Sequence, residues 1–149
     1  MQIALNQAQI AFDDGEIPVG AVIANSKTKE IIAQEHNLVQ TYKNPLLHAE
    51  ICAIQSAVKV LNSKSLSGYD IFVTLEPCAM CASAISHARI DRLFYGASDS
   101  KHGAVENGIK FYTSKTCFHR PEIYIGIQKE FSEQLIKNFF VQARNLLRN

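Results

Sequence analysis

The sequence lacks the features that would place the chain in a membrane or on a secretion pathway. None of its apolar runs approaches the roughly 20 residues that span a bilayer. The first residues, MQIALNQAQIAFDDGE, contain no basic stretch followed by an apolar core, so no secretory signal is indicated. Internal repeats, low-complexity tracts and linkers are lacking as well. We therefore expect a single domain over residues 1–149, located in the cytoplasm and not in a membrane.

An excess of charge of either sign is also lacking, because the formal net charge is only +1. Such a balance neither favours nor excludes a polyanionic partner, since local patches matter more than the sum. Apolar residues make up 47% of the chain and charged residues 19%, which is the mix of an ordinary globular protein. Composition therefore leaves the function open, and the motifs have to decide it.

Cysteine is sparse, with Cys52, Cys78, Cys81 and Cys117 as the four residues of this type. Without a secretory signal, a disulfide framework is disfavoured, because cytosolic thiols stay reduced. Cys78 and Cys81 form a Cys-x-x-Cys pair, which in a cytosolic chain indicates metal binding or redox chemistry. Cys117 has no partner in the sequence, and we expect it to serve packing or to lie on the surface.

The hydrophobic pattern predicts helices that alternate with strands. Helices are expected over residues 3–12, 48–61, 77–88 and 131–147, and strands over 19–24, 30–34, 71–75, 92–95 and 123–127. The first two strands form a hairpin, and residues 36–47 are expected to be a loop. Pro77 is expected at the first helical position. This order predicts an α/β fold with three α/β/α layers and a mixed central sheet. Ligands bind beyond the carboxyl ends of such strands, which is where residues 75–77 lie.

Three metal-ligating residues stand at two predicted helix starts: His48, Cys78 and Cys81. The two cysteines are three residues apart, so their sulfurs share one helix face. Cys78 falls in the first helical turn, where unpaired N–H groups and the helix dipole favour thiolate, the form that zinc binds. Catalytic zinc takes three protein ligands and leaves its fourth position to water, which fits these three residues.

Glu50 lies two residues after His48 and suits a different role. Residues at i and i+2 do not share a helix flank, so both can reach one metal only if the metal sits over the helix start. A carboxylate in that place can take a proton from a metal-bound water and pass it to a leaving nitrogen. We therefore predict Glu50 as the catalytic acid and base.

Two other interpretations of these residues remain open at this point. Cys52 lies four residues after His48, so His48, Cys52, Cys78 and Cys81 could form a closed, structural zinc site that binds partners and catalyses nothing. A redox Cys-x-x-Cys is the third possibility, but it leaves His48 and Glu50 unexplained.

The paired motif resembles a known signature. His48-Ala49-Glu50 followed by Pro77-Cys78-Ala79-Met80-Cys81 is similar to the His-Ala-Glu and Pro-Cys-x-x-Cys halves of the cytidine deaminase-like superfamily. The resemblance covers nearly the whole chain and is greatest to the bacterial tRNA-specific adenosine deaminases. The further matching segments are residues 18–22, Asn37, and residues 74–78, 87–90, 95–99, 103–104 and 139–140.

The resemblance implies one zinc ion per chain and hydrolytic loss of an amine from a nucleobase. Its implied substrate is the wobble adenosine of a tRNA anticodon loop, which becomes inosine, and its implied assembly is a homodimer. By the same resemblance, Asn37 hydrogen-bonds the target base and Asp99 lies beside the flipped-out nucleotide. The remaining substrate-binding residues predicted in this way are Val19, Ala49, Glu76 and Phe140.

Some positions depart from the family pattern or have a plainer explanation. Ser98 and Ala143 stand where we expect arginine, although Arg144 follows Ala143. Phe139 and Phe140 are adjacent and cannot share one helix face, so one can lie in the core while the other is exposed, stacking on a base or covering a dimer contact. Core packing is the default expectation for both. Lys137, Arg144 and Arg148 suit either a solvated helix face or a phosphate-binding rim. A deaminase of a free base or nucleoside, such as cytosine, cytidine or guanine, is the alternative enzyme.

Overall fold

A computed structural model describes residues 1–148 of the chain. It contains a five-stranded sheet in the order β2-β1-β3-β4-β5. β1 pairs antiparallel with β2 and with β3, whereas β3, β4 and β5 run parallel. The predicted mixed sheet and α/β fold are confirmed. The strands are β1 (Gly20–Asn25), β2 (Ile31–His36), β3 (Tyr69–Leu75), β4 (Arg92–Ala97) and β5 (Glu122–Ile125).

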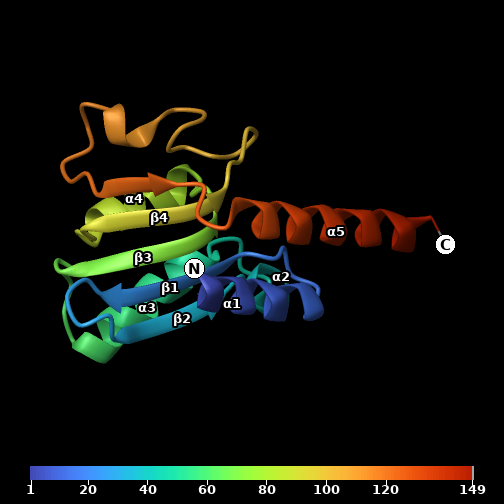
Figure 1. Cartoon of the computed structure of the whole chain (residues 1–149), viewed down its shortest axis with the longest axis horizontal. Coiled ribbons are helices and arrows are strands. Elements are labelled where there is room, and N and C mark those ends of the chain that lie inside the picture. Colours follow the sequence, from blue (N-terminus) through green and yellow to red (C-terminus); the bar gives the residue numbers. More distant parts are fainter. Residues whose placement is uncertain (149) are drawn as a thin grey trace.

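Helices cover the two faces of the sheet in pairs. α3 and α4 pack on one face, while α1 and the beginning of α5 pack on the other (Figure 1). The helices are α1 (Gln2–Asp13), α2 (Val39–Tyr42), α3 (Ala49–Leu61), α4 (Ala79–His87) and α5 (Lys129–Leu147), with a 3-10 turn, η1, at Phe111–Thr113. No helix within residues 1–148 is long and apolar enough to cross a membrane.

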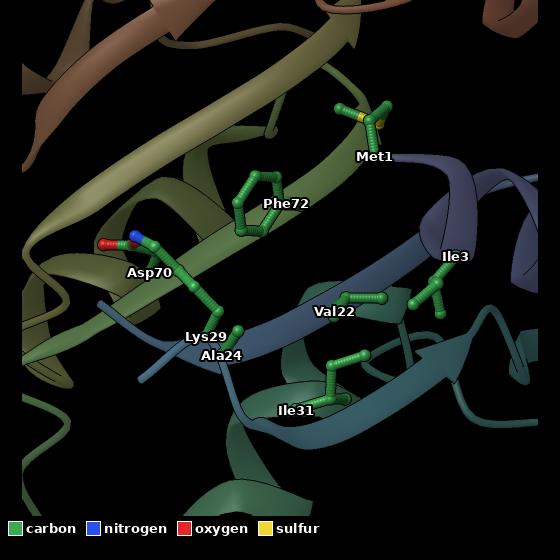
Figure 2. A pocket seen from close by; sticks show the side chains of 8 residues that line it. All are labelled: Met1, Ile3, Val22, Ala24, Lys29, Ile31, Asp70 and Phe72. Carbon is green, nitrogen blue, oxygen red and sulfur yellow. The ribbon is translucent and has the colours of Figure 1, made fainter. Parts of the chain in front are cut away.

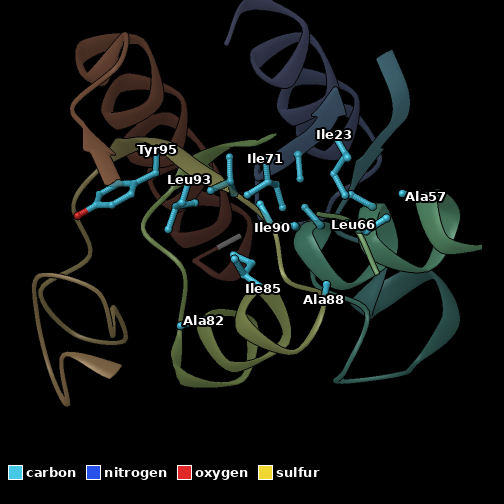
Figure 3. Close-up of a cluster of buried hydrophobic side chains, with 14 of the residues drawn as sticks. Ile23, Ala57, Leu66, Ile71, Ala82, Ile85, Ala88, Ile90, Leu93 and Tyr95 are labelled. Carbon is cyan, nitrogen blue, oxygen red and sulfur yellow. The ribbon is translucent and has the colours of Figure 1, made fainter. Parts of the chain in front are cut away.

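The main core lies between the sheet and the α3/α4 layer. Ile23, Ile71 and Leu93 of neighbouring strands belong to one buried cluster with Ile85 of α4 (Figure 3). The buried face of α3 carries small side chains, Ala49, Ala53 and Ala57 among them. Small residues let the α3 backbone approach closely to β1 and β2, the two strands that it packs against.

The opposite face is covered less completely. Gly20 of β1 faces α1 so closely that a Cβ there would overlap the carbonyl oxygen of Ala4. A hollow of about 160 Å³ lies between the start of α1 and the strands β1, β2 and β3 (Figure 2). At its end the Asp70 carboxylate is paired with Arg92 at 2.6 Å, so its charge is already balanced. None of the candidate site residues lines this hollow, and the site therefore lies elsewhere.

Two local predictions were wrong around the motifs. The segment 36–47, predicted as a loop, contains the short helix α2. Pro77 does not occupy the first helical position, since α4 begins at Ala79 and Cys78 is its N-cap with an extended backbone, φ −72° and ψ 175°. The extended N-cap turns the chain sharply between β3 and α4, and this turn places Cys78 outside the helix but next to its start.

The prediction of core packing for both phenylalanines of α5 was also wrong. Phe139 meets Phe12 of α1 edge to face, with ring centroids 5.7 Å apart, but Phe140 is 43% exposed. Phe139 and Phe140 are adjacent, so their side chains leave α5 in different directions. Phe139 takes the direction that faces α1, and Phe140 is left partly in solvent. Figure 1 shows that α5 continues past the end of the sheet.

Candidate metal centre and active site

The starts of α3 and α4 converge on one point. His48 is the N-cap of α3, with an extended backbone at φ −67° and ψ 153°, and Cys78 is the N-cap of α4. The Nδ1 atom of His48 lies 3.6 Å from the Sγ of Cys78 and 3.6 Å from the Sγ of Cys81. The three predicted metal ligands are therefore brought together, although 30 residues separate His48 from Cys78.

The spacing of these donors fits zinc. Zinc–sulfur bonds of about 2.3 Å and zinc–nitrogen bonds of about 2.0–2.1 Å at a tetrahedral angle separate the two donor atoms by about 3.6 Å. The separations found here have this value, and the three donor atoms all lie within 4.8 Å of one another. One imidazole nitrogen and two thiolates are also a donor set typical of zinc. The site can hold one zinc ion with three protein ligands.

Cys52 is not part of this donor set, so the closed four-ligand site is contradicted. The reason is the position of His48. As an extended N-cap it lies outside the regular helix, and the i, i+4 rule that would align its side chain with Cys52 does not apply. Cys52 is buried, and burial raises the pKa of its thiol to about 11. It stays a neutral thiol in the α3 layer.

Cys78 and Cys81 shift each other's pKa in opposite directions. Donation from the neighbouring Cys81 thiol and from His48 lowers the pKa of Cys78 to about 4. The Cys78 thiolate in turn raises the pKa of Cys81, and burial raises it further. The metal-free pair thus holds one thiolate and one proton. A cation placed between them would displace that proton, which is how metal binding releases protons.

Glu50 lies in the first turn of α3 and is only 4% exposed. Burial raises the pKa of its carboxyl group to about 7, and Cys78, Cys81 and His48 are its charged or hydrogen-bonding neighbours. It stands against the metal ligands but is not one of the three clustered donors. A carboxyl group with this position and this pKa can accept a proton and return it near neutral pH.

Asn37 caps α3 from the loop that follows β2. Its Oδ1 accepts a hydrogen bond from the backbone N–H of Ala49 at 2.9 Å. The backbone N–H of Asn37 donates to the carbonyl of Val19 at 3.2 Å. Because the Oδ1 is engaged, the Nδ2 is the group left to meet a ligand. The structure thus brings Asn37, Val19 and Ala49, three of the predicted substrate-binding residues, next to His48.

A sequence comparison identifies the family of this chain. The family model described as the cytidine and deoxycytidylate deaminase zinc-binding region matches residues 1–97. The chain belongs to this deaminase family. Family membership and the donor geometry together confirm the zinc cofactor that the motifs predict, and they make the chain a zinc-dependent hydrolase. A non-catalytic zinc module is thereby contradicted.

Individual relatives of the chain are known as well. The tRNA-specific adenosine deaminase of Rickettsia bellii is 57% identical over 97% of this chain and 100% of its own length. The tRNA-specific adenosine deaminase of Agrobacterium fabrum is 42% identical over 97% of this chain and 93% of its own. Among solved structures, one from a study of A-to-I editing by tRNA:A34 deaminases at the wobble position superimposes with a TM-score of 0.88. It shares 43% identity and covers 91% of this chain and 96% of its own.

A guanine deaminase from Nitrosomonas europaea shares the deaminase fold. Its TM-score is 0.80, but its identity to this chain is only 18%, over 93% of this chain and 81% of its own. At that identity the likeness concerns the fold alone, and it does not extend to the substrate.

The other predicted substrate residues lie farther along the chain. The Oδ1 of Asp99 accepts the backbone N–H groups of Lys101 and His102, both at 3.0 Å, so it caps the loop after β4. Glu76 is buried at the end of β3 and also faces that loop. Phe140 is partly exposed on α5. For these three residues, contact with a substrate stays a prediction.

Sequence reasoning matched Gly103 to the family without giving it a role, and it missed Asn107 of the same loop. Gly103 forms an isolated β-bridge with the predicted zinc ligand Cys78, and Asn107 hydrogen-bonds to Glu76. The Asn107-Gly108 dipeptide could have indicated a turn. Nothing in the sequence indicates that this turn lies against the metal site.

Proposed function

We propose that this chain deaminates adenosine to inosine at the wobble position of a tRNA anticodon loop. Relatives of 55–57% identity that carry the name tRNA-specific adenosine deaminase support this substrate. The observation that carries the chemistry is the buried Glu50 carboxylate beside three zinc-binding donors. A tRNA substrate also implies that the enzyme works in the cytoplasm, as the sequence predicts.

The residues of the site divide the reaction between them. When bound, zinc supplies the nucleophile by lowering the pKa of a water molecule to about 7. Asn37 orients the adenine ring through its Nδ2, while its Oδ1 stays fixed by Ala49. Glu50 takes the proton of the water and delivers it to the ring nitrogen next to C6, as oxygen adds to C6. Glu50 then takes the second proton from the new C6 hydroxyl and gives it to the exocyclic amine, so that C6 becomes a carbonyl carbon, the C6–N bond breaks, and ammonia leaves.

An assay on an RNA hairpin will test this substrate. We expect the protein with its zinc to convert the wobble adenosine of an anticodon stem-loop to inosine, detected by nucleoside analysis of the digested RNA. A stem-loop with guanosine at that position is the control. Under the same conditions free cytosine, cytidine and guanine should not turn over. Turnover of a free base or nucleoside together with an inert stem-loop would overturn the proposal in favour of the alternative enzyme.

The response of RNA binding to salt is a second readout of the same assay. Lys137 and Arg144 are exposed on α5 and can neutralise phosphates. Binding should weaken as salt rises, and each phosphate contact that is lost should reduce the slope of log K against log salt by about 0.9. Lys137→Gln and Arg144→Gln should therefore give smaller slopes. A flat response in the unchanged protein would argue against RNA as the partner.

The proposal includes a homodimer formed through α4. The residues of α4 that are not buried are Ala79, Met80, Ser83, Ala84 and His87. Phe118 packs against His87, with ring centroids 5.0 Å apart. Phe118 is 57% exposed and Ile109 65% exposed, so both leave apolar surface uncovered. We expect sedimentation equilibrium to give twice the chain mass, and Phe118→Glu to give the monomer. A monomeric unchanged protein would contradict the dimer.

A further inference from the structure

Glu76 anchors the loop that follows β4. Its side chain is 2% exposed, and its Oε1 accepts the backbone N–H groups of Glu106 at 3.0 Å and of Asn107 at 3.2 Å. A buried carboxylate needs several donors to offset the loss of water. Here the far end of the loop supplies them, so the loop and the carboxylate hold each other in place.

Asn107 closes the loop on itself. Its Nδ2 lies 3.2 Å from the Oε1 and 3.1 Å from the Oε2 of Glu76, and 2.9 Å from the Oγ of Ser98. Ser98 is the first residue after β4, and Asn107 is nine residues farther along. One amide group therefore joins both ends of residues 98–107 to the buried carboxylate. We call Glu76, Ser98 and Asn107 the loop clamp.

The clamped loop rests on the metal site. Gly103, at its middle, forms the bridge with Cys78, and the N–H of Ala104 donates to the carbonyl of Pro77 at 2.9 Å. A Cβ at Gly103 would overlap the Glu76 carboxylate, so no larger residue fits between the loop and the clamp. The position of the loop is thus coupled to the turn that carries the first zinc-binding cysteine.

We propose that Asn107 is a positioning residue, which with Glu76 and Ser98 holds residues 98–107 against the Cys78 turn as a preformed wall for the RNA substrate. The inference rests on the proposed function for the identity of the substrate. The clamp itself does not depend on that identity. RNA binds only to the protein molecules whose loop is in place. The apparent Kd for RNA therefore rises as the fraction of molecules with an ordered loop falls.

Substitutions that swap the amide of Asn107 and the carboxylate of Glu76 will test the clamp. Asn107→Asp removes the donor and places a second carboxylate beside Glu76. We expect hydrogen exchange at residues 104, 106 and 107 to become at least about tenfold faster, since bonds to a charged group are lost. KM for the stem-loop should rise about tenfold while kcat and zinc content stay nearly unchanged.

The double variant with Glu76→Gln and Asn107→Asp should restore the clamp. The glutamine Oε1 can still accept both backbone N–H groups, and its amide can donate to the new carboxylate. KM and the hydrogen-exchange rates should return to within about threefold of the values for the unchanged protein. The reason is that the hydrogen bond between positions 76 and 107 forms again, with donor and acceptor swapped. Asn25→Asp is the matched control. The Oδ1 of Asn25 only accepts hydrogen bonds in the β1–β2 turn, so this change should leave all three readouts as they are.

Several outcomes would overturn the clamp. One is that Asn107→Asp leaves hydrogen exchange and KM unchanged. A second is that it lowers kcat and zinc content at constant KM. A third is that the double variant has the same KM and hydrogen exchange as Asn107→Asp alone. If Asn107→Asp does not fold, Asn107→Ser removes most of the donor capacity without adding charge, and the same readouts apply. If the unchanged protein leaves the stem-loop unmodified, the proposed function fails, whereas hydrogen exchange still decides the clamp.

Discussion

Glu50→Gln will lower kcat about 10³-fold, within the range that a positioned proton-transfer group contributes, while the protein keeps its zinc. Glutamine has nearly the same shape as the carboxyl form, so the packing at this buried position is preserved. It cannot take a proton from water or return one to the leaving amine. Steady-state kinetics on the stem-loop and metal analysis of the same sample will measure both quantities.

The control for this variant is Glu30→Gln. It makes the same chemical change at an exposed residue next to β2, and kcat should stay unchanged. Near-normal kcat in Glu50→Gln would remove Glu50 from the mechanism. Loss of zinc from Glu50→Gln would instead make it a residue that supports the metal, and the role of proton carrier would be wrong.

Cys81→Ser will weaken zinc binding by more than about a hundredfold and will abolish deamination. Changes to the partners of metal ligands already cost about 10–100-fold in affinity, and loss of a ligand costs more. The Sγ of Cys81 lies 3.6 Å from His48 Nδ1 and is fully buried, so no water can easily take its place. The fold should persist, because Cys81 lies outside the main core cluster. Metal titration and far-ultraviolet circular dichroism will test the two statements.

Cys52→Ser is the matched control for the ligand variant. Cys52 lies outside the cluster of donors, so this protein should bind one zinc ion and keep its kcat. Its thermal stability should fall only modestly, since the substitution places a hydroxyl at a buried position. Zinc loss in Cys52→Ser, or full zinc content in Cys81→Ser, would contradict the open three-ligand site.

The periodicity of apolar residues predicted most of the fold. Four of the five α-helices and all five strands lie where the pattern placed them, to within a few residues. The exceptions have physical reasons. α2 is one turn long and has no buried residue, so no apolar periodicity marks it. Phe140 is exposed because its neighbour Phe139 takes the face of α5 that meets α1, and the sequence does not say which of the two adjacent rings does so.

The sequence by itself determined which residues can carry the chemistry of this protein. By residue type and spacing, His48, Cys78 and Cys81 predicted a metal site and Glu50 a proton carrier, while a closed site and a redox pair stayed open. The resemblance of the paired motif to the deaminase signature favoured the open catalytic site. The alternation of helices and strands likewise determined the layered fold, because that pattern depends on burial along each element.

Only the tertiary structure decided which neighbours these residues have. The exclusion of Cys52, the capping of α3 by Asn37 and the closure of the loop by Asn107 all depend on backbone direction where an element begins or ends. A rotation of one residue there redirects a side chain by a large angle, and the partners come from distant parts of the chain. Local sequence patterns carry periodicity but not these directions, so the contacts that shape the site emerge only when the elements pack together.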